Sequence, residues 1–126
     1  MKIIKVENNK KKYLDLLLLG DEQESMIDLY LDKGDMFVAA DNGVKAECVV
    51  VKCEDRVYEL KNIAVAPEFQ RMGYGKKLVE YILSYYNDCD TMYVGTGDSE
   101  KTLNFYKACG FKESHSCLLY TSDAAD

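Results

Sequence analysis

Histidine and long apolar stretches are nearly absent from this sequence, and each absence excludes a class of protein or site. The 126 residues contain one histidine, His115, which argues against a histidine-based zinc site and against a Ser-His-Asp triad. No stretch reaches the 18 apolar residues of a membrane-spanning helix, and residues 1–6 lack the apolar core of a secretory signal, so a cytoplasmic protein is expected. The cysteines lack the spacing of a metal site and are predicted to be free thiols: Cys48, Cys53, Cys89, Cys109 and Cys117.

The balance of charge limits the partners. A net charge of −6 argues against nucleic acid, because phosphate contacts require clustered lysines and arginines. Acidic side chains concentrate in residues 15–35, where seven of them accompany the single base Lys33. A solvated helix surface is the simplest interpretation of this run.

Hydrophobic periodicity predicts one mixed α/β domain, since 126 residues suffice for a single core. Asn42-Gly43 favours a hairpin turn, and Pro67, the only proline, ends the strand before it. The expected strands are residues 1–6, 36–40, 44–53, 57–66 and 91–97, and the expected helices are residues 10–19, 22–33, 74–86 and 99–109.

The most informative segment is the loop Gln70-Arg71-Met72-Gly73-Tyr74-Gly75-Lys76, which joins a predicted strand to a predicted helix. Such a loop leaves unpaired backbone N–H groups at the positive end of a helix dipole, which favours an anion such as phosphate. Glycines at 73 and 75 are expected to allow close backbone approach and positive φ, and Arg71 and Lys76 add positive charge.

Two common phosphate loops do not fit this segment. A Walker loop has four residues between its glycines and Ser or Thr after its lysine, and a dinucleotide fingerprint has a third glycine where Leu78 stands. The pattern Gln/Arg-x-x-Gly-x-Gly after Ile63-Ala64-Val65 instead resembles the acetyl-CoA pyrophosphate loop of the GCN5-related N-acetyltransferases (GNATs). A second motif at the family's spacing, Tyr106 followed by Gly110-Phe111, extends the resemblance. A glycine-containing loop without a ligand is the alternative.

The resemblance implies the GNAT acyl-CoA N-acyltransferase fold, a mixed and mostly antiparallel sheet flanked by helices. It implies an N-acetyltransferase that moves an acetyl group from acetyl-CoA to a primary amine by direct attack, without a metal. The implied cofactor-binding residues are Ile63, Ala64, Val65, Gln70, Arg71, Met72, Gly73, Tyr74, Gly75, Lys76 and Ser99. Ser99 replaces the asparagine that many family members use to bind the pantetheine arm.

The same resemblance implies two catalytic side chains. Tyr106 matches the family tyrosine near the sulfur and would protonate the departing thiolate, although it could also be a core residue. Glu59 stands four residues before Ile63, where several members carry a base, and on a regular strand it would share a face with Ile63. An exposed structural role for Glu59 is the alternative.

The resemblance also suggests the partners. In the family the first two helices form a wall of the acceptor site, so their acidic residues, including Asp28 and Asp32, would attract a cationic amine. The expected acceptor is a small-molecule or peptide amine, no nucleic-acid or membrane partner is expected, and a homodimer is compatible with the sequence. A non-catalytic acyl-CoA-binding or regulatory module of the same fold, and a module that binds ATP or NAD, are the rival functions.

Residues 117–126 resemble, at every position, the in-frame translation of a transposon-based sequencing-library adapter. A natural acidic tail is the alternative. The resemblance implies that residues 1–116 form the N-acetyltransferase domain, cut short at its C-terminus, and that residues 117–126 are an artefactual tail. The sheet is then expected to lack its final strand or to replace it with residues 118–121.

Overall fold

A computed structural model describes residues 1–95, 100–113 and 119–122 of the chain. Seven strands form one sheet in the order β1-β2-β3-β4-β5-β7-β6. All neighbours are antiparallel except β4 and β5, which run parallel. The strands are β1 Lys2–Val6, β2 Asp35–Ala40, β3 Val44–Glu54, β4 Val57–Val65, β5 Thr91–Gly95, β6 Lys112–Glu113 and β7 Leu119–Ser122.

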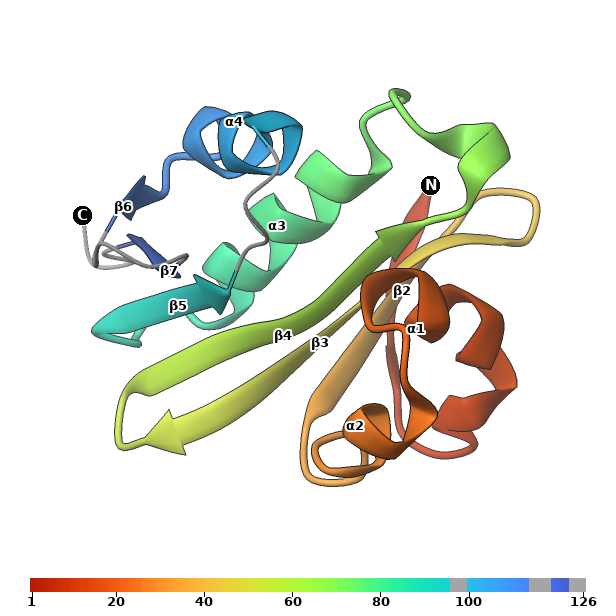
Figure 1. The fold of residues 1–126 in the computed structure, drawn as a ribbon, viewed down its shortest axis with the longest axis horizontal. Helices are drawn as coiled ribbons and strands as arrows, with labels where there is room; N and C mark the ends of the chain where they lie inside the picture. The colour runs from red at the N-terminus through yellow and green to blue at the C-terminus, as the bar shows by residue number, and fades with distance from the viewer. Residues whose placement is uncertain (96–99, 114–118, 123–126) are drawn as a thin grey trace.

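Helices cover both faces of this sheet (Figure 1). One face carries α1 and α2, and the other carries α3 and α4, so each strand residue faces one of two apolar layers. On β3 the alternation is regular, with Cys48 and Val50 facing α3 and α4, and Val49 and Val51 facing α1 and α2. The helical segments are η1 Lys10–Tyr13, α1 Leu14–Gly20, α2 Glu24–Asp28, η2 Pro67–Phe69, α3 Tyr74–Tyr85 and α4 Glu100–Ala108.

Most of the predicted elements are present, and the N-terminal helices differ most from expectation. The predicted helix over 10–19 begins as the 3-10 segment η1, and the predicted helix over 22–33 is regular only from Glu24 to Asp28. Lys10 binds the segment that follows α2, because its ammonium donates to the carbonyl oxygens of Leu31 at 2.9 Å and Gly34 at 2.6 Å. No helix among the described residues is long and apolar enough to cross a membrane.

Strand β4 changes its pairing halfway along. Val57 to Leu60 pair with β5, and the register with β3 shifts between Leu60 and Asn62, which leaves Lys61 as an extra, bulged residue. Beyond the bulge β4 continues to Val65 without β5 beside it (Figure 1). Among the described residues no strand pairs with that edge of β4 beyond the bulge, so its backbone groups can pair with an added strand or an extended ligand.

The C-terminal edge of the sheet corrects one expectation. The final strand is present, because Leu119–Ser122 pairs with β5 from Met92 to Gly95 and also with Lys112–Glu113. The alternative expectation, that residues 118–121 replace the missing strand, differs by one residue at each end from the observed strand Leu119–Ser122. Pairing with β4 uses one edge of β5, and Leu119–Ser122 pairs with the other edge. The adapter origin of residues 117–126 stays a prediction.

Candidate active site

A cavity of about 580 Å³ lies where β4 separates from β5. We call it the main cavity. Its floor is the free end of β4, its rim is the loop that leads into α3, and α4 closes one side. The lining residues are Leu19, Ile63, Ala64, Val65, Phe69, Gln70, Arg71, Gly73, Tyr74, Gly75, Lys76, Phe105 and Tyr106.

The start of α3 supplies hydrogen-bond donors to this cavity. The first helical hydrogen bond runs from Lys77 N to Gly73 O at 3.0 Å, so the N–H groups from Gly73 to Lys76 have no partner within the helix. No side chain caps this helix start among the described residues. Unpaired N–H groups and the helix dipole together make the rim suited to a phosphate group.

The two glycines of the loop act differently from each other. Gly73 has φ of +90°, as predicted, and an added Cβ would meet nothing within 4 Å. Gly75 lies inside the helix without positive φ, so the expectation of positive φ at Gly75 is wrong. A Cβ at Gly75 would lie 3.3 Å from Phe105 Cζ and 3.5 Å from Val65 Cγ2, which makes it a packing glycine between α3, α4 and β4. Arg71 also adopts positive φ, of +66°.

Gln70 and Tyr74 hold the loop in place. The Gln70 side-chain amide donates to Val65 O at 3.2 Å, which ties the loop to the end of β4. The Tyr74 hydroxyl contacts Asp41 Oδ2 at 3.1 Å, which ties the loop to the turn between β2 and β3. Both residues line the cavity, so these tethers fix the position of its rim.

Tyr106 lies at the opposite wall, on α4. Its ring packs edge-on against Phe105 at 5.1 Å and Phe111 at 5.8 Å, and only 5% of the residue is exposed. Burial raises the pKa of Tyr106 well above its usual value, so the phenol keeps its proton at neutral pH. It can therefore donate a hydrogen bond into the cavity, but it cannot act as a base there.

Glu59 is not in the main cavity. The bulge at Lys61 moves Ile63 to the α3–α4 face of the sheet, where it pairs with Cys48, while Glu59 pairs with Val51 on the α1–α2 face. The expectation that Glu59 shares a face with Ile63 is therefore wrong, because a bulge adds one residue to the alternation. Glu59 instead lies 3.5 Å from the Lys61 ammonium.

Glu59 lines a second, smaller cavity, which has a volume of about 270 Å³. Lys33 and Lys61 share it with Asp21 and Glu59, so the second cavity carries both signs of charge. Glu59 is therefore placed away from the residues that line the main cavity.

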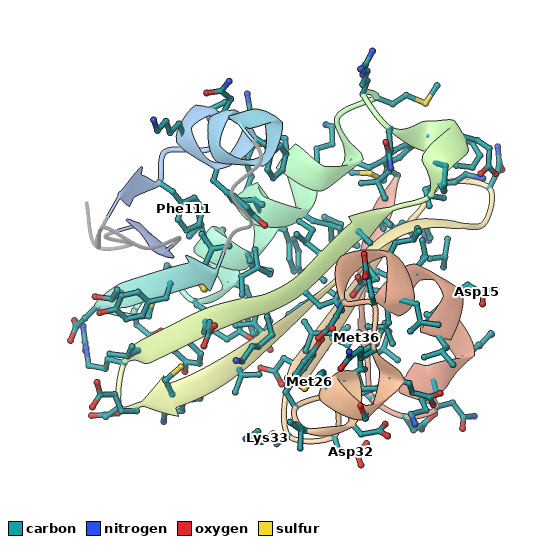
Figure 2. All side chains as sticks on the ribbon, in the orientation of Figure 1. Asp15, Met26, Asp32, Lys33, Met36 and Phe111 are labelled. Carbon is teal, nitrogen blue, oxygen red and sulfur yellow. The ribbon has the colours of Figure 1, made fainter. Side chains whose placement is uncertain are left out.

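The acidic residues of the N-terminal helices do not gather at either cavity as a group. Asp28 forms an ion pair with Lys11 at 2.6 Å, and Asp28 and Asp32 line a separate hollow. Asp15 and Asp32 point outward from the α1–α2 layer (Figure 2). Only Asp21 of this run lines the second cavity. The solvated-surface interpretation therefore describes most of the acidic run.

The sequence reasoning missed a buried polar pair, Glu47 and Asn62. Glu47 is 0% exposed and Asn62 is 3% exposed, and both lie on the α1–α2 face of the sheet. Asn62 Nδ2 donates to Leu17 O and to the Tyr30 hydroxyl, both at 3.0 Å. A single charged residue within the otherwise apolar run from Ala46 to Val51 was the signal that could have revealed Glu47.

Comparison with known proteins agrees with this geometry. The sequence matches the Acetyltransferase (GNAT) domain family over residues 32–113. This chain belongs to the GNAT acetyltransferase family. A curated relative, the uncharacterized N-acetyltransferase YvbK of Bacillus subtilis, is 36% identical over 110 residues, which cover 84% of this chain and 70% of the relative.

Solved GNAT structures share the fold across almost the whole chain. A GNAT acetyltransferase from Elizabethkingia anophelis with acetyl-CoA bound gives a TM-score of 0.87 at 26% identity. A Bacillus subtilis acetyltransferase in complex with CoA gives 0.85, also at 26% identity. Each alignment covers 97% of this chain and 97% of the other. The predicted family and fold are confirmed.

The GNAT structure thus brings together most of the predicted cofactor residues at one cavity. Met72 is the exception within the loop, because its side chain is 64% exposed and does not line the cavity. Ser99 lies outside the described residues. Leu19, Phe69 and Phe105 line the cavity without having been predicted, since apolar residues on separate elements carry no local motif.

Proposed function

We propose that this GNAT domain transfers an acetyl group from acetyl-CoA to a primary amine by direct attack. One observation carries the proposal. The unpaired N–H groups of α3, the free edge of β4 and the Tyr106 side chain all border the same cavity. Acetyl-CoA would supply an activated thioester carbonyl to this cavity.

The residues of the cavity have separate tasks in the proposal. The N–H groups from Gly73 to Lys76, with the Arg71 and Lys76 side chains, would hold the pyrophosphate. The backbone of Ile63 to Val65 would pair with the pantetheine arm as an added strand and polarise the acetyl carbonyl. Tyr106 would donate its proton to the departing sulfur.

Direct attack is favoured over a covalent enzyme intermediate. None of the described cysteines lines the main cavity. Burial raises the pKa of Cys48 and of Cys109, which disfavours the reactive thiolate. The amine is therefore the expected nucleophile.

Ligand-dependent thermal stability tests the cofactor assignment. Acetyl-CoA and CoA at a hundred times their dissociation constant should stabilise the fold by about 2.7 kcal/mol, whereas ATP and NAD should not. Arg71→Gln should weaken acetyl-CoA binding. Arg56→Gln is the matched control, because Arg56 pairs with Asp90 and does not line the cavity. Equal shifts with ATP would contradict the proposal.

Turnover across a library of amines tests the reaction. Release of CoA that depends on both acetyl-CoA and an amine would support an N-acetyltransferase. Binding of acetyl-CoA without turnover on any amine would favour the rival, a non-catalytic acyl-CoA-binding or regulatory module of the same fold.

A further inference from the structure

Three hydrogen-bond acceptors are buried together on the α1–α2 face of the sheet without a donor. They are Glu47 Oε1, Glu47 Oε2 and Asn62 Oδ1, and none has a hydrogen-bond partner among the described residues. Glu47 pairs with Ala64 across the two strands and Asn62 pairs with Val49, so the two side chains are diagonal neighbours on one face. Buried acceptors without donors are uncommon in folded proteins.

The neighbouring groups do not supply the missing donor. Val38 on β2 and Ala64 on β4 face Glu47 and are apolar. Tyr30, Cys48 and Tyr106 are the titratable groups that interact with the Glu47 charge, and none of them carries positive charge. The Tyr30 hydroxyl is already engaged, because it accepts from Asn62 and contacts Asp21 Oδ2 at 3.3 Å.

The electrostatic consequence is a carboxyl group that titrates near neutrality. Desolvation raises the pKa of Glu47 from 4.5 to about 8. A general base is most effective when its pKa lies near the working pH.

The acceptor cluster lies directly behind the wall of the main cavity. Ala64 lines that cavity and is the cross-strand partner of Glu47, at a typical Cβ separation of about 5 Å. The end of α1 lies close above the cluster, since a Cβ on Gly20 would lie 2.1 Å from Asn62 Oδ1. Alanine at 64 leaves only a methyl group between Glu47 and the cavity.

We propose that the Glu47 carboxylate and Asn62 Oδ1 form the acceptor-side proton site, where the attacking primary amine is held and loses its proton. In its carboxylate form Glu47, together with Asn62 Oδ1, presents three acceptor atoms, and a primary amine can satisfy them because it carries several protons. Glu47 and Asn62 do not line the main cavity, so the amine would contact them through one water molecule. The inference rests on the proposed acetyl transfer.

The proton and electron balance of the step is complete. The amine nitrogen forms a bond to the acetyl carbon, and the bond from that carbon to sulfur breaks. One amine proton passes to the Glu47 carboxylate, and the departing thiolate takes a proton from Tyr106. Exchange with solvent then returns the proton to Tyr106 and removes the one from Glu47.

The first test is a pH–rate profile measured with two probe amines, n-butylamine and the less basic glycinamide. An inflection that belongs to Glu47 should stay near pH 8 with both amines, whereas an inflection of the amine itself should move. Glu47→Gln should remove the fixed inflection and lower turnover about 10²–10⁴-fold. Glu54→Gln, on the exposed end of the same strand, is the matched control and should change neither.

Acetyl-CoA affinity and a Glu59→Gln variant complete this test. Unchanged acetyl-CoA binding by Glu47→Gln would show that the variant is folded and that its defect concerns the proton. An unaltered profile in Glu47→Gln, with turnover intact, would overturn the inference and leave the proposed function standing. Loss of the fixed inflection in Glu59→Gln instead would assign the base to Glu59.

The second test does not depend on turnover. The side-chain carboxyl carbons of ¹³C-glutamate-labelled protein are followed by NMR, and the resonance absent from Glu47→Gln is assigned to Glu47. It should titrate near pH 8, and n-butylamine should shift it in the presence of acetyl-CoA. A resonance that titrates near 4.5, or that does not respond to n-butylamine, would overturn the inference even if neither probe amine is acetylated. Failure of acetyl-CoA to bind at all would instead refute the proposed function.

Discussion

At the scale of single residues, burial decides which polar side chains can do chemistry. Tyr106 and Glu47 are both removed from water, and desolvation raises the pKa of each. The effect keeps Tyr106 protonated as a donor, while it brings Glu47 into the range where it can accept a proton. Glu59, which the sequence favoured as the base, is partly exposed and lies beside Lys61.

Replacement of Tyr106 by Phe should lower kcat about 10²–10⁴-fold, the usual loss for a general acid. Acetyl-CoA affinity should hardly change, because the ring and its packing against Phe105 and Phe111 are preserved. Steady-state kinetics and calorimetry measure the two quantities. Tyr93→Phe on β5, outside the main cavity, is the control. An unchanged kcat would make Tyr106 a core residue only.

Replacement of Glu47 by Gln should stabilise the fold increasingly as the pH rises. Unfolded Glu47 releases its proton near pH 4.5, whereas the folded group holds it to about pH 8. The unfolded state therefore binds fewer protons in this window, and wild-type stability falls by at most about 1.4 kcal/mol per pH unit. The variant lacks this loss.

Chemical denaturation of both proteins from pH 4.5 to 9 measures the effect. The difference between them should grow through the window and level off above pH 8. A difference that is constant with pH would mean that the Glu47 carboxyl keeps its ordinary pKa in the folded protein.

At the scale of elements, the loop before α3 and the bulge in β4 together make the cavity. The bulge changes which side chains of β4 point to each face of the sheet, and it lies where the pairing with β5 ends. The first half of β4 therefore pairs with β5, whereas the second half borders the cavity. The loop then places the start of α3 opposite that free half. Gly75 allows α3 to lie this close to Phe105 and Val65.

Two glycines with positive φ allow a matched test of the loop. An added Cβ would meet nothing within 4 Å at Gly73, where φ is +90°, and only Lys45 Nζ at 3.8 Å at Gly43, where φ is +103°. Gly73→Ala and Gly43→Ala should each destabilise the fold by about 1–2 kcal/mol, the cost of left-handed backbone for a residue with a Cβ. Only Gly73→Ala should weaken acetyl-CoA binding, because only Gly73 lines the main cavity.

Thermal unfolding and calorimetry with acetyl-CoA distinguish the two effects. Equal acetyl-CoA affinity in both variants would show that the backbone at Gly73 does not contact the ligand. Gly75→Val should abolish binding for a different reason, since its branched side chain would push α3 away from Phe105 and Val65.

At the scale of the whole molecule, the C-terminal strand closes the sheet beside β5. Removal of residues 117–126 should lower the melting temperature, because it deletes the pairing of Met92–Gly95 with Leu119–Ser122 and exposes a strand edge. A loss of 1 kcal/mol corresponds to roughly 4 °C in a domain of this size. Scanning calorimetry of the two chains measures the shift. Identical melting temperatures would mean that the tail does not contribute to the sheet in solution.

The local motifs of this chain were sufficient to predict its family and most of its cavity. The loop from Gln70 to Lys76 and the pair Tyr106 and Gly110-Phe111 are short, and their chemistry depends on backbone geometry that neighbouring residues determine. Hydrophobic periodicity predicted the order of strands and helices, because periodicity also depends on residues that are close together in the sequence. Within the loop, Met72 does not line the cavity and Gly75 lacks the positive φ that was expected.

The tertiary structure alone decided which side chains meet across elements. A single bulged residue, Lys61, reversed the face of Glu59, and periodicity cannot reveal a bulge. Glu47 gains its significance from burial under α1, from Asn62 on another strand and from Ala64 at the cavity wall. The sequence thus determined the anion-binding loop and the fold, whereas packing between distant segments determined where a proton can be taken, because desolvation is a property of the assembled core.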